Sequence, residues 1–409
     1  MNPFKAFYKK TSEERKQILV QEGRYDLKLD TPLLEETYSH MIENSVTTYE
    51  IPMGIATGFL INDKEYLIPM ATEEPSVIAA ASNAAKIIAQ NKGFKAKVIS
   101  RIMSGEIAFD NPFDPVAMNT YIETHQEELF DIANKAHPSI LKRGGGIKKI
   151  YSSIIQSELL TPFFIVRIDV DTQEAMGANI INTILEALAN HLELAFNQSP
   201  LMAILTNLSE NCIVEAKVLI DPKTLKEPDT IAKKIVSASH LSILDPYRTA
   251  THNKGVMNGI SALVLASGND TRAIEASMYS YAKGQPFTLW TLENDLIKGT
   301  ISIPMPIGFV GGSIGLNPKA QLVHKIMDIH SAEELMMIIA SVGLAQNFAA
   351  LYALTTDGIQ KGHMRLHAKS IAINAGATKE NVDEVTTLLL SQQHINLETA
   401  KRIIEQIKE

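Results

Sequence analysis

The chain has 409 residues, of which 45% are hydrophobic and 21% are charged, and its net charge at pH 7 is −8. This composition is typical of soluble globular proteins, and the length predicts two or three domains. The negative charge argues against nonspecific nucleic-acid binding, which needs a basic surface. A single cysteine, Cys212, excludes an internal disulfide framework, and the first sixteen residues contain no apolar signal core, so we expect a cytoplasmic protein.

Two structural patterns occupy the N-terminal part of the chain. Residues 11–45 are predicted to be helical, beginning at the sequence Thr11-Ser12-Glu13-Glu14. Two short segments of alternating character follow at 58–61 and 65–69. The polar residues 62–64 between them predict a β-hairpin.

The segment 71–93 predicts a further helix, because it is rich in alanine, with Pro75 placed to start the helix and Gly93 placed to end it. Glu73 and Glu74 then lie at the N-terminus of this helix. Acidic residues there complement the helix dipole, which contributes roughly a few tenths of a kcal/mol. This pattern alone therefore indicates no function for either carboxylate.

The middle of the chain predicts a small α+β unit inserted into a larger one, with strands and helices in βαβ-like alternation. The expected strands are 96–102, 163–170 and 217–221, the expected helices are 127–136 and 174–196, and a tight turn is expected at 144–146. Glycines at 144–146 and 308–312 could approach a phosphate closely, although such clusters are more often plain turns. The sequence contains no G-x-G-x-x-G or H-E-x-x-H motif.

Residues 245–270 concentrate polar chemistry around a short apolar run. The run, Ala262 to Ala266, predicts a buried strand bounded by Gly259 and Gly268. Its polar neighbours are Arg248, His252, Asn253, Lys254, Asn258, Asn269 and Asp270. Because an unpaired buried charge is costly, we expect Lys254 and Asp270 to pair. The pair could serve the fold alone, but the density of Arg, Asn and Gly around it favours an active site.

Residues 335–356 contain no charged side chain and are long enough to span a bilayer. Ser341, Gly343, Gln346 and Asn347 lie in the middle of the segment, and neither an aromatic belt nor a basic flank marks its ends. We therefore predict a buried core helix, with a membrane span as the alternative.

The last part of the chain is more polar. Asp357-Gly358 is expected to end the apolar helix, and a tail of about fifty residues ends in an amphipathic helix near 397–408. His363 and His367 are spaced to share one helix face and could bind a metal as a pair. No cysteine or third clustered histidine accompanies them, so we expect no metal site.

Several sequence blocks, in this order, resemble the soluble bacterial class II 3-hydroxy-3-methylglutaryl-CoA reductases. The blocks are ENSV at 43–46, EEPSVIAAAS at 73–82, EAMGAN at 174–179, TNL at 206–208, DPYRTATHNKGVMNG at 245–259, SGND at 267–270, PMPIGFVGG at 304–312, VGLAQN at 342–347 and GHMRLH at 362–367. Their number, order and spacing make the resemblance specific, and it replaces the structural interpretations of Glu74, His363 and the Lys254/Asp270 pair.

The resemblance implies an α+β fold with three parts. A large, mostly helical substrate- and CoA-binding domain (1–100 and 207–360) is interrupted by a small α+β domain that binds NAD(P) (101–206). A helical flap (361–409) follows at the C-terminus. The family also implies a homodimer or a higher even oligomer, with the active site at the subunit interface and no membrane partner.

The resemblance assigns roles residue by residue. The catalytic set is Glu74, Lys254, Asp270 and His363. The substrate-binding set is Ser76, Arg248, Asn207 and Asn258. The cofactor-binding set is His137, Met176, Gly177 and Asn179, and no metal is expected.

The implied reaction reduces the thioester of 3-hydroxy-3-methylglutaryl-CoA to mevalonate and CoA with two hydrides from NAD(P)H. Lys254 stabilises the oxyanion, and a neighbouring Asp270 keeps it charged and oriented. His363, on the flap, protonates the departing CoA thiolate. Glu74 supplies the proton for the final alkoxide.

The cofactor is expected to be NADPH, with NADH possible. NADH-using members of the class carry an aspartate that binds the adenosine ribose, and His137 stands at that position here. Lys135, Lys142 and Arg143 are near it in sequence and could bind a 2′-phosphate.

Two alternatives remain open at this stage. A binding protein could hold CoA esters without chemistry, although it gives no reason for four catalytic residue types to coexist. The same enzyme could also run in the catabolic direction, oxidising mevalonate, because both directions use one active site.

Overall fold

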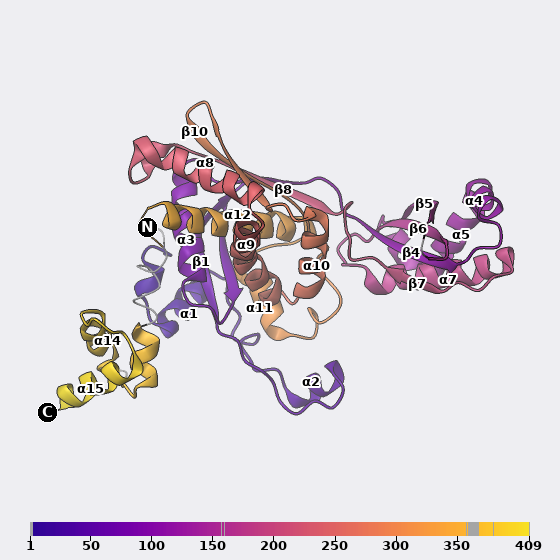
Figure 1. The fold of residues 1–409 in the computed structure, drawn as a ribbon. Coiled ribbons are helices and arrows are strands. Elements are labelled where there is room, and N and C mark those ends of the chain that lie inside the picture. The colour runs from indigo at the N-terminus through magenta and orange to yellow at the C-terminus, as the bar shows by residue number, and fades with distance from the viewer. Residues whose placement is uncertain are drawn as a thin grey trace.

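The computed structural model of the chain describes residues 3–156, 158, 160–356, 358, 368–378 and 380–408. Helices and three antiparallel sheets build it, which confirms the mixed α and β composition. Figure 1 shows a large unit around α9 and α12, a small unit joined to it by extended chain, and a cluster of helices at the C-terminus. We call residues 3–101 with 206–356 the large unit and residues 102–205 the small unit.

The N-terminal segment contains two helices rather than one. After a 3₁₀ helix, η1 (Phe7–Lys9), helix α1 (Ser12–Gln21) begins as predicted, with a capping box between Thr11 and Glu14. The single helix predicted over 11–45 is wrong, because the chain turns at Gly23, where φ is 69°, and becomes helical again only in α2 (Glu35–Met41).

The predicted hairpin is confirmed and is longer than expected. Strands β1 (Met53–Ile61) and β2 (Lys64–Ala71) pair antiparallel. The turn residues Asn62 and Asp63 both have positive φ, 49° and 67°, which suits the right-handed twist of the strands.

Helix α3 (Val77–Gln90) follows the hairpin, but it starts later than predicted. Ser76 has a left-handed backbone, with φ of 75°, so Pro75 lies outside the helix instead of at its first position. The predicted end is confirmed: Gly93, with φ of 72°, donates its N–H to the Ile88 carbonyl. Glu73 and Glu74 therefore lie in the loop before α3.

The sheet of the large unit has the strand order β3-β8-β10-β9, with every neighbouring pair antiparallel. Its strands are β3 (Lys95–Val98), β8 (Ile213–Ile220), β9 (Thr288–Glu293) and β10 (Leu296–Pro304). The other elements of this unit are η2 (Pro222–Thr224), α8 (Pro228–Leu244), α9 (Pro246–Ala266), α10 (Thr271–Ala282), α11 (Pro318–Met327) and α12 (Ala332–Thr355).

Helix α12 is the predicted apolar core helix. It is long and apolar enough to cross a membrane, but 78% of its most apolar window is buried inside the fold. It packs against α3, α8, α9 and the sheet, which favours the core-helix interpretation. Gly358, with φ of 82°, donates its N–H to the Ala353 carbonyl and so ends the helix where expected.

The strand predicted at 262–266 is wrong, because these residues form the last part of α9. Asp245 caps the helix by accepting from the Tyr247 N–H at 3.1 Å, and Pro246 occupies the first turn. A short apolar run is equally compatible with a buried strand and a buried helix. Gly259 marks close packing here, since a Cβ on it would lie 3.0 Å from Val342 on α12.

The small unit is built as a split βαβ arrangement, with strand order β5-β6-β4-β7 and helices between the strands. The strands are β4 (Ile102–Asp110), β5 (Gly146–Ile155), β6 (Phe163–Asp171) and β7 (Met202–Leu205). The helices are α4 (Pro115–Thr124), α5 (Gln126–Ala136), α6 (Pro138–Lys142) and α7 (Ala178–Phe196).

Most sequence predictions for the small unit are confirmed. Strand β6, helix α5 and the glycine turn at 144–146 lie where expected, and Gly144 and Gly146 have φ of 87° and 109°. Helix α7 begins at Ala178 instead of 174. The strand predicted at 96–102 is divided between β3 and β4, which belong to different sheets.

The C-terminal helices form a core of their own. Residues 368–374 are helical, and α14 (Val382–Leu390) and α15 (Leu397–Lys408) follow. The predicted amphipathic helix at 397–408 is confirmed: its apolar face, with Ile403 and Ile404, is buried in a cluster separate from the main core. His363 and His367 lie outside the described residues.

Candidate active site

Two predicted site residues of helix α9, Lys254 and Asn258, both contact a third, Glu74. The Lys254 Nζ lies 2.6 Å from Glu74 Oε2, and Asn258 Nδ2 donates to Glu74 Oε1 at 3.3 Å. Lys254 and Asn258 are four residues apart on α9, so their side chains leave the same face of the helix. Both oxygens of one carboxylate are thereby held by two side chains of a single helix.

The loop before α3 brings Glu74 to this helix. Strand β2 ends at Ala71, and the Glu74 N–H donates to Thr72 Oγ1 at 3.2 Å. Helix α9 packs against both β2 and α3, so the loop between those two elements lies beside it. Ser76 then adopts its left-handed backbone, and its buried Oγ has no hydrogen-bond partner among the described residues.

The ion pair contributes little to the stability of the fold. The side chains of Lys254 and Glu74 are 60% and 37% exposed. An exposed pair is screened by water and typically contributes about 0.2–1 kcal/mol. The exposed ammonium group can therefore meet a ligand without the loss of a large folding contribution.

The predicted pairing of Lys254 with Asp270 is wrong in this structure. Asp270 caps helix α10 by accepting from the Arg272 and Ala273 N–H groups, and the Arg272 guanidinium also donates to both of its oxygens at 3.0 Å. The hydrogen bonds from Arg272 lower the pKa of the Asp270 carboxyl. Asp270 therefore pairs with Arg272, two residues further along the chain, whereas Lys254 pairs with Glu74, which is 180 positions away in the sequence.

The remaining substrate-binding candidates do not contact this carboxylate directly. Arg248 lies two turns before Lys254 on α9 and is half-buried, which lowers the pKa of its guanidinium through loss of water. Within the described part of the chain no carboxylate pairs with it. Asn207 is exposed in the connection between β7 and β8.

Three of the four predicted cofactor residues, Met176, Gly177 and Asn179, lie at the N-terminus of α7. Gly177 has φ of 101° and precedes the helix, and a Cβ on it would lie 2.2 Å from Thr172 Cγ2, so only glycine fits. No side chain caps the first turn of α7, and its first turn contains no acidic residue. These features suit the close approach of an anion to the helix N-terminus. Met176 is half-buried and Asn179 is exposed.

His137 lies elsewhere in the small unit, between α5 and α6, with its Nδ1 3.3 Å from Ser139 Oγ. Lys135 is paired with Asp131 at 2.5 Å, whereas Lys142 and Arg143 are exposed and have no acidic partner among the residues described. Lys142 and Arg143, two of the three cations expected near a 2′-phosphate, are therefore free to bind an anion.

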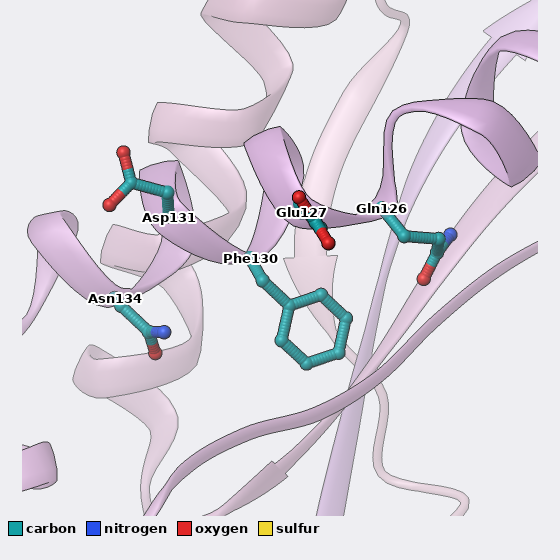
Figure 2. Close-up of a pocket in the computed structure, with 5 residues that line it drawn as sticks. All are labelled: Gln126, Glu127, Phe130, Asp131 and Asn134. Carbon is teal, nitrogen blue, oxygen red and sulfur yellow. The ribbon is translucent and has the colours of Figure 1, made fainter.

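A shallow cavity of about 410 Å³ runs along α5, and Figure 2 shows the ring of Phe130 projecting into it. Gln126, Glu127, Asp131 and Asn134 complete its lining. It contains none of the predicted cofactor residues. Two carboxylates on its wall disfavour a phosphate, so we do not assign the 2′-phosphate to it.

A buried polar network beneath α9 was not predicted from the sequence. The Asn347 amide oxygen accepts from Trp290 Nε1 at 2.7 Å and from Thr288 Oγ1 at 2.8 Å. His252 Nε2 lies 2.6 Å from the same threonine hydroxyl, and burial lowers the pKa of His252 to about 4. Asn347 interrupts an otherwise apolar helix, and a buried amide there needs partners, which is the signal that could have indicated the network.

No group of three or more His, Cys, Asp or Glu suited to a metal occurs in the described ranges. The histidine pair at 363 and 367 lies outside those ranges.

Comparison with known proteins identifies relatives over nearly the whole chain. A model of the family described as hydroxymethylglutaryl-coenzyme A reductase matches residues 8–368. A 3-hydroxy-3-methylglutaryl-coenzyme A reductase of Archaeoglobus fulgidus is 41% identical, covering 98% of this chain and 94% of the relative. A probable reductase of the same name from Borreliella burgdorferi is 36% identical, covering 91% and 88%.

Solved structures agree with these relatives. A 3-hydroxy-3-methylglutaryl-coenzyme A reductase from Streptococcus pneumoniae matches with a TM-score of 0.84 at 41% identity, covering 99% of both chains. A structure of the class II reductase from the same organism, bound to NADPH in open conformations, matches with a TM-score of 0.83, covering 86% of this chain and 100% of that one.

Proposed function

The chain belongs to the hydroxymethylglutaryl-coenzyme A reductase family, and from this premise we propose how its own residues carry out the reaction. It is a reductase of the bacterial class II type, which converts 3-hydroxy-3-methylglutaryl-CoA to mevalonate and CoA. The observation that carries the proposal is the contact of Lys254 and Asn258 with the Glu74 carboxylate. It joins a cation, a hydrogen-bond donor and a proton carrier at one exposed place on the large unit.

We assign Lys254 to the oxyanion. The thioester carbonyl and, later, the aldehyde carbonyl each gain negative charge on oxygen when the carbon is reduced. An ammonium group held beside that oxygen stabilises the charge, and such donors are typically worth about 3–4 kcal/mol. Because both steps pass through an oxyanion at the same place, one residue serves both.

We assign Glu74 to the proton that the final alkoxide requires. Its two oxygens are already in contact with Lys254 Nζ and Asn258 Nδ2, so a proton can pass within one hydrogen-bonded cluster. Asn258 orients the carboxyl group from the same helix.

Asp270 belongs to this cluster only if it changes partner. Its present contact with Arg272 is exposed, with the two side chains 45% and 89% accessible, so opening it is inexpensive. We propose that Asp270 turns from Arg272 towards Lys254 when substrate is bound. The change would keep the ammonium charged and oriented during the reaction.

Arg248 is proposed to bind the carboxylate of the hydroxymethylglutaryl group. Its guanidinium has already lost part of its water and has no carboxylate partner in the described part of the chain, so an anionic ligand would supply one. The unpartnered Ser76 hydroxyl, two residues after Glu74, and the exposed amide of Asn207 are further candidates for the substrate.

His363 is proposed to protonate the departing CoA thiolate. An imidazolium ion titrates near neutral pH, which suits this step. Its position on a C-terminal flap, 361–409, would allow it to cover the CoA sulfur and later to release it.

The small unit, with boundaries near 101 and 206, is proposed to hold the cofactor. Two NADPH molecules, bound one after the other, would each supply one hydride. The cradle at Gly177 and the uncapped amides of α7 fit the cofactor's phosphates, and the exposed Lys142 and Arg143 fit a 2′-phosphate near His137. The NADPH named in the Streptococcus pneumoniae structure supports this choice, and NADH remains the weaker candidate.

Assembly and location are proposed on the same basis. A homodimer, or a higher even oligomer, would cover the exposed face around Lys254. The burial of α12 inside the fold supports a cytoplasmic location. Neither a metal nor a nucleic acid enters the proposal.

The test is spectrophotometric. Purified protein with 3-hydroxy-3-methylglutaryl-CoA should oxidise two equivalents of NADPH per CoA released, followed at the nicotinamide absorbance. The reverse assay, with mevalonate, CoA and NADP⁺, determines how readily the catabolic direction runs. Tight binding of CoA esters without any change in absorbance in either direction would favour a binding protein instead.

A further inference from the structure

The loop at residues 173–176 opens the cofactor motif of the small unit, yet it makes several hydrogen bonds with the large unit. The Glu174 carbonyl accepts from the Phe309 N–H at 2.8 Å and from the Val310 N–H at 3.2 Å, and Ala175 forms an isolated bridge with Val310. Gly308 allows this approach, because a Cβ on it would lie 2.8 Å from the Met176 nitrogen. The backbone is therefore docked on the 307–310 segment.

The Glu174 side chain makes a second contact of the same kind. Its Oε2 accepts from the Ala332 N–H at 2.6 Å, at the start of α12. The first turn of a helix leaves N–H groups without partners, and a carboxylate there is favourable for charge as well as for hydrogen bonding. Ser331, the residue just before the helix, accepts from the Glu334 N–H, and Glu174 supplies a second cap from the other unit.

Arg101 holds the same loop from the opposite side. It lies at the crossing from β3 to β4, where the chain enters the small unit, and it donates to the carbonyls of Gln173 and Ala175, the latter at 3.1 Å. Its other terminal nitrogen donates to the Ile307 carbonyl at 3.2 Å. One guanidinium thus joins the cofactor loop, the segment that receives it and the boundary between the two units.

The 307–310 segment, on which the loop is docked, is hydrogen-bonded to the proposed catalytic region. Asn269, next to Asp270, clamps Gly308 by donating to its carbonyl at 3.0 Å and accepting from its N–H at 2.8 Å. Helix α12, which Glu174 caps, packs along α9. The cofactor loop is therefore connected to Asp270 through the 307–310 segment and Asn269, and to Lys254 through α12 and α9.

We infer that Glu174 and Arg101 are positioning residues that fix the cofactor loop against the large unit, and so set the distance between the bound nicotinamide and the carbonyl held by Lys254. The inference depends on the proposed function. The Glu174 carboxylate is occupied by α12 and is assigned no contact with the cofactor. Hydride transfer is sensitive to such placement, since an error of about 1 Å can cost 10²-fold in rate.

The test compares Glu174→Ala with Glu174→Gln, whose amide oxygen can still accept from the Ala332 N–H. For Glu174→Ala we expect kcat for thioester reduction to fall about 10–100-fold. The Kd for NADPH should stay near the wild-type value, because the rest of the cofactor is held elsewhere. The primary deuterium isotope effect on kcat, measured with NADPH deuterated at the transferred position, should rise. Glu174→Gln should recover most of the rate.

The matched control is Glu333→Ala, which removes an exposed carboxylate from the same turn of α12 without touching the loop. Its kcat should stay within about twofold of wild type, as for ordinary surface substitutions. Arg101→Lys provides an independent variant that keeps the positive charge but has no guanidinium to reach several carbonyls at once. It should show the same rise in isotope effect as Glu174→Ala.

A purely structural role predicts a different result: kcat falls in proportion to the folded fraction, with the isotope effect unchanged. That result, or wild-type kinetics in both Glu174→Ala and Arg101→Lys, would overturn the positioning role. An inactive wild type would overturn the proposed function as well, so the two failures are distinguishable.

Discussion

The proposed substrate site on α9 and the proposed cofactor site at α7 are built from different parts of the chain. On α9, side chains make the site: an ammonium and an amide of this helix both contact a carboxylate in the loop before α3. At α7, the backbone makes it: a glycine with positive φ and an uncapped helix start. The first site should therefore be sensitive to loss of a functional group, and the second to addition of a single carbon atom.

The largest effect is expected from Lys254→Ala. Removal of an oxyanion donor typically costs about 10²–10³ in kcat, and here the loss should appear in both half-reactions because each forms an oxyanion at the same place. Thioester reduction and mevaldehyde reduction are measured separately. Near wild-type rates in either assay would show that the two steps do not share this residue.

His363→Gln should separate the two half-reactions. A general acid typically contributes about 10²–10⁴-fold, and only thioester reduction expels a thiolate that needs its proton. We expect that step to be lost and the reduction of free mevaldehyde to persist. Equal losses in both assays would instead assign His363 to folding or to closure of the flap.

Gly177→Ala tests the backbone site. The left-handed conformation costs about 1–3 kcal/mol for a residue with a side chain, and the Cβ also collides with Thr172. We expect weaker NADPH binding and a lower Tm. Gly144→Ala is the matched control, because its φ of 87° is also positive but its Cβ would meet no atom within 4 Å. If the two variants behave alike, the collision has no role.

The smallest effect is expected from His137→Asp. A carboxylate at this position accepts a ribose hydroxyl and repels a 2′-phosphate, so the ratio of kcat/KM for NADPH to that for NADH should fall, by about tenfold for each 1.4 kcal/mol. Wild type should use NADPH well. A wild-type enzyme strictly specific for NADH would contradict the assignment of His137.

The sequence predicted local elements more reliably than their contacts. The start of the first helix at Thr11, the hairpin turn at Asn62 and the end of α3 at Gly93 depend on neighbouring residues, and all are confirmed. The run at 262–266 was assigned to a strand because five apolar residues do not distinguish the two periodicities. Only the position of Pro246, sixteen residues earlier, reveals the helix.

In the candidate site, too, the contact between distant residues could not be predicted from the sequence. Lys254 was identified, but its partner was predicted to be the nearby Asp270, whereas in the structure it is Glu74. Sequence proximity favours the first pairing, and only the packing of α9 against β2 and α3 brings the second carboxylate closer. The roles of His363 and of the substrate and cofactor residues remain predictions, and the variants above test those of His363, Gly177 and His137.

The strand order also has a consequence for the order of folding during synthesis. Strand β3 pairs with β8, but every strand of the small sheet, β4 to β7, is translated between them. At about 5–20 residues per second, the small unit can complete its hydrogen bonding seconds before the partner of β3 leaves the ribosome. The hairpin of β1 and β2 can pack against α3 meanwhile, but the faces that later contact α9 and α12 stay uncovered. The first hundred residues therefore expose apolar surface until α9 and α12 have been translated.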